Sequence, residues 1–387
     1  MNPPVHTTHG LSRRTWLVLV GSSLSACGGG GTGGMTAGLA PGTGGTGAAL
    51  YSQGAISGFG SVIINGIRFD DTLASVQVDG RAAATSDLRL GMVAGVRGTR
   101  SATDTTLGTA NAIEVWSIAQ GLVTTVNGRN FETSGMTIQT DSNTSLEGID
   151  VASPLVAGQT VTVWGLQAGA NGALWTATRV AVVSASNNRV STGLVKRAGE
   201  QYTVNGWNLS GAASEALREG PLVRVQGTQG TSNSLEVSSF RLLDSGFDAV
   251  AASLLEIEGV VTQVLTGSRF MVGSITVECR TAALLAMARE LALGDRIEVN
   301  GSWSSAVLVA SQIEIEHSQN QVIEIEARIE QFVSLSNFVM RGQRCDASAA
   351  VFRNGKATDL QKWTGMVEVK GHKAGDVLRV TELEFAH

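Results

Sequence analysis

A pattern of eleven residues that returns along the chain constrains the fold more than any other feature of this sequence. With x for any residue, the pattern is L-x-x-G-x-x-V-x-V-x-G, and it runs from Leu155 to Gly165. Related stretches start at Leu88, Leu217, Leu291 and Leu360, the last with one extra residue. These starts lie 62 to 74 residues apart, so the chain is predicted to be a row of small, related domains.

Each repeat is expected to consist mainly of strands. Glycine is frequent, at 48 of 387 residues, and charged residues make up 16%. Apolar residues alternate in the opening segment of each repeat, as from Gly259 to Val264, which is typical of a strand with one buried face. An aromatic residue opens the second segment and is expected in the core; these residues are Phe131, Tyr202, Phe270 and Phe338, with Phe69 near the same place in the first repeat.

The remaining segments complete a familiar order. A third strand is predicted at Val76–Asp79 in the first repeat, and a helix at Ala282–Leu291 in the fourth, followed by Gly294 where a left-handed residue is wanted. Two further strands follow, and the first of them is expected to close with a turn glycine at 98, 165, 227, 301 or 371. Three strands, a helix and two strands is the order of an OB-fold barrel. The predicted fold is all-β: a tandem array of about five small OB-fold-like β-barrels after a Gly-rich tether.

The repeat pattern also sets the predicted boundaries. The five OB-like repeats are expected at residues 55–116, 118–185, 191–243, 255–317 and 322–387. The short join from Ser117 to Gln120 indicates close neighbours, whereas Asp244 to Ser253 is long enough to be a hinge.

The first 26 residues differ from the rest and are interpreted as a signal peptide. The twin arginines Arg13 and Arg14 precede a short apolar run, which is typical of a secretory or twin-arginine export signal. The run Leu24, Ser25, Ala26, Cys27 resembles the bacterial lipobox, in which the cysteine is the residue that is lipidated. Residues 27–50 contain 11 glycines after position 27 and are predicted to be a flexible tether.

Three stretches of the first repeat resemble a known family. They are Gly58–Phe69, Val76–Gly80 and Leu90–Met92, and together they look like the DUF5666 family of bacterial envelope proteins. The resemblance extends from about Ala55 to the end of the chain. It implies the fold and an envelope location but no chemistry, because the family has no known function.

Charge argues against nucleic acid as the partner. The formal net charge is −5 and becomes −7 once Arg13 and Arg14 leave with the signal peptide. Binding of single-stranded nucleic acid, which OB folds often perform, needs clustered lysines and arginines and is therefore disfavoured.

No catalytic or metal-binding constellation is apparent, and no cofactor is expected. His317 and His372 have no neighbouring ligand at metal-site spacing and are interpreted as surface residues. Four glutamates alternate with isoleucines across the junction of the last two repeats: Glu314, Glu316, Glu324 and Glu326. They are interpreted as solvated strand faces. The alternative is an envelope enzyme that processes carbohydrate or peptide with paired carboxylates such as Glu314 and Glu316.

Two tryptophans and two cysteines complete the candidates. Trp164 and Trp175 are weighed as one sugar-contacting patch against simple packing in the core. Cys279 and Cys345 are interpreted as buried thiols, with a disulfide between them as the alternative.

The sequence as a whole predicts a lipid-anchored protein of the bacterial cell envelope. In a Gram-negative organism, Gly28 after the lipidated Cys27 resembles the sorting pattern for the periplasmic side of the outer membrane. The expected function is that of a non-enzymatic binding or scaffold module with an unidentified envelope protein or glycan as partner.

Overall fold

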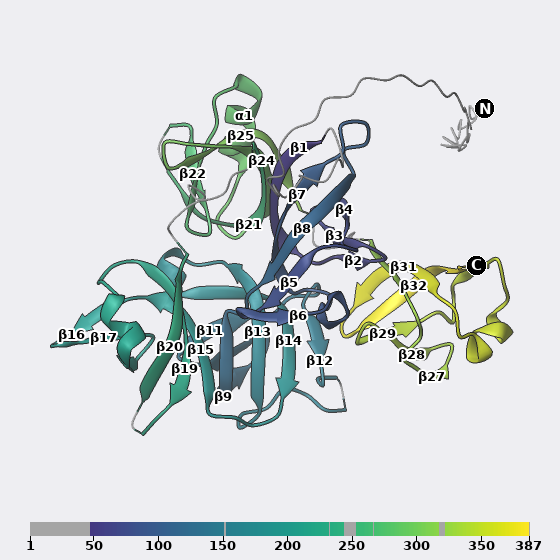
Figure 1. Ribbon diagram of the computed structural model, residues 1–387, viewed down its shortest axis with the longest axis horizontal. Coiled ribbons are helices and arrows are strands. Elements are labelled where there is room, and N and C mark those ends of the chain that lie inside the picture. The colour runs from purple at the N-terminus through teal and green to yellow at the C-terminus, as the bar shows by residue number, and fades with distance from the viewer. Residues whose placement is uncertain are drawn as a thin grey trace, which may run out of the picture. The chain divides into compact units, whose positions relative to one another are not determined.

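The computed structural model describes residues 47–150, 152–231, 233–243, 253–265, 267–316 and 322–386. Most of this part of the chain is β-strand (Figure 1). Within it, no helix combines the length and apolarity that crossing a membrane requires. The candidate residues of the signal and lipidation segment, Arg13, Arg14, Leu24, Ser25, Ala26 and Cys27, lie outside the described residues. So do the predicted hinge, except Ser253, and His317.

The fourth barrel shows the repeat in its most regular form. Its elements are β21 (Leu254–Val264), β22 (Arg269–Val272), β23 (Ile275–Glu278), α1 (Ala282–Glu290), β24 (Arg296–Ser304) and β25 (Val307–Ile315). The strands pair in the closed ring β21–β22–β23–β25–β24–β21, with β23 and β25 parallel and the other pairs antiparallel. This is the OB-fold order that the sequence predicts, and α1 matches the predicted helix.

The second barrel closes through the same ring. Its elements are β9 (Ala119–Asn127), β10 (Asn130–Thr133), β11 (Met136–Gln139), β12 (Ser145–Glu147), β13 (Thr160–Gln167), η2 (Ala170–Gly172) and β14 (Leu174–Val183). The strand β11 runs parallel to β14, and β13 pairs with both β14 and β9. The additional strand β12 also lies parallel to β14, farther along.

Barrels one, three and five have the same order with the opening strand broken in two. Barrel one comprises β1 (Ala48–Ala55), β2 (Gly58–Phe59), β3 (Val62–Ile64), β4 (Ile67–Asp70), β5 (Ser75–Val78), β6 (Arg81–Ala83), η1 (Thr85–Asp87), β7 (Val93–Arg100) and β8 (Leu107–Val115). Barrel three comprises β15 (Asn188–Leu194), β16 (Lys196–Ala198), β17 (Gln201–Val204), β18 (Trp207–Ser210), η3 (Ala212–Ala216), β19 (Leu222–Gln229) and β20 (Ser234–Leu242). Barrel five comprises β26 (Ile323–Ala327), β27 (Gln331–Ser334), β28 (Asn337–Met340), β29 (Gln343–Asp346), β30 (Val351–Arg353), η4 (Ala357–Lys362), β31 (Val367–Ala374) and β32 (Val377–Phe385).

Apolar side chains fill each barrel as the alternation predicts. Phe131, Phe270 and Phe338 are buried in the cores of barrels two, four and five, and Tyr202 packs against the core of barrel three. Cys279 and Cys345 are buried free thiols in two different core clusters, so the disulfide alternative is wrong.

The structure corrects two boundaries in barrel one. Strand β1 begins at Ala48 and Leu50 is 2% exposed in the core, so the predicted tether of residues 27–50 extends too far. The third strand is β4, which contains Phe69 and runs parallel to β8 as β23 does to β25. The predicted third strand, Val76–Asp79, is the additional strand β5, which pairs with β8 farther along.

The final glycine of the repeat is not a turn residue, contrary to the prediction. Each of the five lies inside a strand at a β-bulge, where the register to the neighbouring strand shifts by one residue. A Cβ there would lie 2.0 to 2.5 Å from a carbonyl oxygen of the neighbouring strand. Because no side chain fits at that distance, the bulge requires glycine. The five glycines are Gly98, Gly165, Gly227, Gly301 and Gly371.

The other glycine of the repeat has a separate function. Gly91, Gly158, Gly220 and Gly294 have φ angles between +76° and +111°. Each donates its N–H to a carbonyl in the opening strand of its own barrel or, in barrels one and three, at the break in that strand, at 2.9 to 3.0 Å. The left-handed conformation favours glycine and directs the chain into the fourth strand of the ring.

Replacement of Gly301 by alanine is expected to destabilise barrel four by about 1 to 3 kcal/mol, because the new Cβ would collide with the carbonyl oxygen of Val309, 2.2 Å away. Hydrogen exchange of the amides in β24 and β25 measures the effect. Ser302→Ala, at an exposed position of the same strand, is the control. Equal protection in the two variants would contradict the requirement for glycine at the bulge.

Candidate functional site

The opening strands of the barrels join neighbouring barrels together. Strand β1 pairs in parallel with β21, so that Leu50 lies opposite Leu254, and β2 pairs in parallel with β26. Strand β15 meets β9 through a single pair, Val190 and Gln120. Barrels one, four and five thereby share one sheet, and barrels two and three share another.

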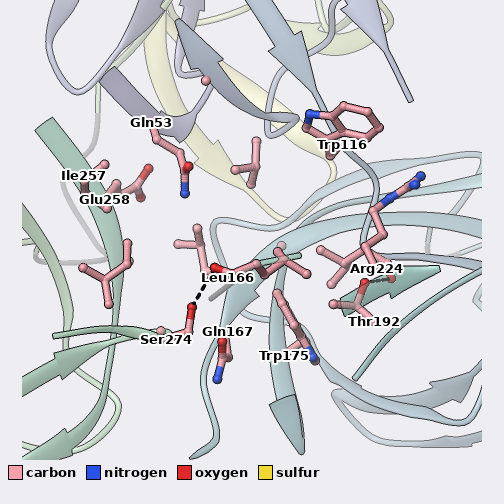
Figure 2. Close-up of a pocket in the computed structure, with 18 of the residues that line it drawn as sticks. Gln53, Trp116, Leu166, Gln167, Trp175, Thr192, Arg224, Ile257, Glu258 and Ser274 are labelled. Carbon is pink, nitrogen blue, oxygen red and sulfur yellow. Dashed lines mark hydrogen bonds between the residues drawn. The ribbon is translucent and has the colours of Figure 1, made fainter. Parts of the chain in front are cut away.

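A cavity of about 160 Å³ lies where barrels one, two, three and four meet. We call it the junction cavity. Its lining residues are Tyr51, Gln53, Val93–Gly95, Glu114, Trp116–Ile118, Gly165–Gln167, Trp175, Thr192, Arg224, Arg241–Leu243, Ile257–Val260 and Val272–Ile275. Figure 2 shows Gln53, Glu258, Leu166 and Ser274 around this space, with Trp116 and Arg224 beside it. Four barrels contribute, so no single repeat contains the site.

A network of buried polar contacts links barrels one and three beside the cavity. The Arg224 guanidinium donates through Nη2 to Asp79 Oδ1 at 2.7 Å and through Nε to the Ser117 carbonyl at 2.6 Å. Asp79 also accepts from the Ser117 N–H at 2.8 Å. Burial lowers the pKa of Arg224 and the Asp79 carboxylate opposes that shift, so the ion pair keeps the guanidinium charged.

Two arginine side chains pack over the ring of Trp116. The guanidinium carbons of Arg224 and Arg241 lie 5.2 and 5.0 Å from the ring centroid, which is cation–π distance. Arg241 also bonds the Tyr51 hydroxyl. Burial raises the pKa of Tyr51 and Arg241 opposes the shift, so the hydroxyl stays protonated at neutral pH.

A second buried ion pair lies on the opposite wall. Glu258 is 4% exposed, pairs with Arg296 and accepts from the Ala55 N–H at 2.7 Å. Burial lowers the pKa of Arg296, but the Glu258 and Glu316 carboxylates raise it, and the net shift is upward. The contact with Ala55 ties barrel four to barrel one.

Two buried carboxyl groups lie next to each other on neighbouring strands of barrel four. Glu256 on β21 and Glu298 on β24 are 1% and 8% exposed and bond each other. Burial, together with the Glu256 charge, raises the pKa of Glu298 to about 8. Such burial keeps substrate away from the pair. The two carboxyl groups are also within hydrogen-bond distance, whereas the two catalytic carboxyl groups of glycosidases lie about 5 to 9.5 Å apart.

The carboxylates suggested by the sequence are mostly held by basic or amide partners. Glu316 lies 4.0 Å from Arg296, and Glu324 pairs with Arg68 and, at 3.8 Å, with Lys370. Glu314 is exposed and accepts from Gln312. In the described ranges, no group of three or more His, Cys, Asp and Glu residues has metal-binding geometry.

The two candidate tryptophans do not form one patch. Trp175 is 3% exposed in the core of barrel two and donates to the Gly172 carbonyl at 3.1 Å, while its edge borders the junction cavity. Trp164 is 6% exposed and packs outward into the core cluster of barrels one and five. The two rings belong to different cores, so the structure does not bring them together in one patch.

Sequence reasoning missed the residues that surround the junction cavity. Trp116 follows the last strand of barrel one, and Arg224 and Arg241 lie on separate strands of barrel three. Nothing in their spacing connects them. The only signal that the sequence offers is that these residues differ from those at the same positions of the other repeats.

Lys373 is a further buried group that the sequence did not indicate. It reaches from barrel five to barrel two, where Nζ donates to Ser145 Oγ at 2.9 Å and to the Thr144 carbonyl at 3.3 Å. Burial lowers its pKa to about 7. It borders a small cavity of about 20 Å³, too small for an organic ligand.

The fold and the cavity define a class: a tandem OB-fold protein whose barrels enclose a shared cavity. Residues 120–181 and 258–314 match DUF5666, a domain of unknown function. These segments lie in barrels two and four and confirm the resemblance inferred from the sequence. The stretch at Gly58–Phe69, which first indicated it, is outside the matched residues.

The remaining comparisons are distant. No curated protein matches the chain. One matching solved structure is a deletion mutant of the single-stranded DNA-binding protein from Thermus aquaticus, at 13% identity and a TM-score of 0.15. The match covers 53% of this chain and 95% of that one. At that TM-score the similarity carries no argument about function.

Removal of the Asp79 carboxylate is expected to loosen the junction of barrels one and three. In Asp79→Asn the Arg224 guanidinium, whose side chain is 3% exposed, loses its countercharge, at a cost of about 3 kcal/mol. Hydrogen exchange in β19 and β8 measures the change. Glu200→Gln removes an exposed charge from barrel three and is the control. Unchanged protection in Asp79→Asn would contradict a stabilising ion pair.

The Glu256–Glu298 pair predicts stability that falls as the pH rises. An unfolded glutamate releases its proton near 4.5, whereas Glu298 in the folded chain keeps it to about 8. The folded chain therefore binds more protons between these values, and stability is lost across that window, at about 1.4 kcal/mol for each pKa unit. Glu298→Gln should flatten the dependence of thermal unfolding on pH from 5 to 8. Glu290→Gln, exposed at the end of α1, should leave it unchanged.

Proposed function

We propose that this protein is a non-enzymatic binding module of the bacterial cell envelope, held at the membrane by a lipid on Cys27, and that its ligand occupies the junction cavity. The observation that carries the proposal is the cavity itself. Four barrels enclose a space lined by both apolar and charged side chains. Ligand sites in proteins are commonly concave, with apolar walls and a few placed polar groups.

The charges around the cavity favour binding over catalysis. Glu258 and Glu114 are held by Arg296 and Arg97, and Asp79 by Arg224. A general base or nucleophile needs a carboxylate that is available to the substrate, whereas these carboxylates hold barrels together or neutralise neighbours.

The proposed anchor agrees with this arrangement. A tether after a lipidated Cys27 would keep the barrels near a membrane surface while leaving them accessible to an envelope protein or glycan. A terminal sugar or a protruding side chain of such a partner would enter the cavity, and the barrels would supply the rigid frame.

Filling the cavity tests the proposal. Ser274 lines it, and Ser274→Trp should abolish capture of the partner in intact cells by crosslinking and mass spectrometry. Ser304→Trp, which adds the same ring at the exposed end of β24, should capture the partner as the wild type does. Cys27→Ala should lose capture as well, because the anchor is gone.

The outcomes separate the parts of the proposal. If Ser274→Trp captures the partner as well as the wild type does, the cavity is not the binding site. If Cys27→Ala captures the partner equally well, the proposed lipid anchor is wrong and the proposed cavity site still stands.

A further inference from the structure

One charge at the junction cavity has no countercharge in the described chain. Three of the four charged side chains that line the cavity have an oppositely charged partner: Glu114 with Arg97 at 2.8 Å, Arg224 with Asp79 at 2.7 Å, and Glu258 with Arg296. For the fourth, Arg241, no carboxylate of the described residues lies within 4.0 Å. Among the described residues, the lining therefore carries one positive charge without a countercharge.

The position of Arg241 suits recognition of an anion. Its guanidinium lies over the Trp116 ring, 5.0 Å from the centroid, and bonds the Tyr51 hydroxyl. A guanidinium stacked by its face keeps N–H groups in its plane for an acceptor. A carboxylate matches these N–H groups in a bidentate pair, which is among the stronger hydrogen-bonded contacts in proteins.

The rest of the cavity suits a small apolar body. Leu166, Trp175, Val260 and Val272 contribute apolar surface from barrels two and four. A cavity of about 160 Å³ is close in size to an engineered cavity of about 150 Å³ that holds benzene in another protein. A ring of six atoms with one attached group is therefore the size that fits.

Building on the proposed function, we infer that the junction cavity binds a small organic carboxylate with a ring-sized apolar body, the carboxylate lying on Arg241. The carboxylate supplies the countercharge that the lining lacks, and the ring fills the space between barrels two and four. A carboxylate at the end of a larger envelope partner satisfies the same chemistry as a free acid.

Benzoate and benzamide are the matched probes, because they have the same ring and nearly the same size but differ in charge. Calorimetric titration of the purified full chain in detergent should show benzoate binding at least tenfold more tightly than benzamide. Arg241→Gln should weaken benzoate binding at least tenfold and leave benzamide unchanged. Arg269→Gln removes an exposed arginine of barrel four and should bind both probes as wild type does.

Three results would overturn the inference. Benzoate binding that survives Arg241→Gln would exclude the guanidinium as its partner. Equal affinity for benzamide and benzoate, or no binding of either, would exclude a carboxylate ligand of this size.

Failure here is separable from failure of the proposed function. If Ser274→Trp abolishes partner capture while Arg241→Gln leaves it intact, the cavity is the binding site and the ligand class is wrong. If Ser274→Trp captures the partner normally, the proposed site itself fails.

Discussion

The close approach of two backbones at the bulge in each barrel is the contact on which the rest of the structure depends. At this point the fifth strand of the ring has one extra residue, which bends that strand as the sheet closes, and its carbonyl occupies the place where the glycine of the fourth strand would carry a side chain. Closure gives each barrel a core in fewer than eighty residues. Closure also fixes the position of the opening strand of each barrel. The opening strands of neighbouring barrels then pair with one another, β1 with β21 and β2 with β26. The junction cavity therefore follows from how four of the small barrels close and join.

Buried charge holds these junctions together, with a different chemistry at each. Arg224 and Asp79 connect barrels three and one, and Glu258 with Arg296 supports the contact of barrel four with Ala55. Lys373 connects barrels five and two through neutral partners. Removing one member of a buried ion pair leaves its partner desolvated, which costs more than the pair contributes as a whole. The junctions consequently specify which barrel meets which, even though the barrels resemble one another.

The features that could be predicted from the sequence are those with a local cause. The repeat, the alternation and the aromatic core positions depend on neighbours in the chain, and they predicted the OB-fold order, α1 and the buried Phe131, Phe270 and Phe338. The sequence predicts turns at the bulge glycines because a glycine at the end of an apolar run has the same pattern in a turn and in a bulge, and only the facing carbonyl distinguishes the two. Trp164 and Trp175 are close in sequence but belong to different cores, which periodicity does not reveal. The junction cavity joins Gln53, Trp116, Arg224 and Glu258 from separate repeats, so no spacing within one repeat could indicate it.

The pairing of β1 with β21 has a consequence for how the protein assembles. Ser253 bonds the Ala49 carbonyl across a separation of 204 residues, the kind of contact that forms slowly because a long stretch of chain must first be closed. Each barrel, by contrast, closes through contacts within about seventy residues. The barrels should therefore be complete before the first and fourth meet, and the interface between them should exclude water late in folding. A ligand present at that stage would be enclosed during docking, and its departure afterwards would require the same interface to part.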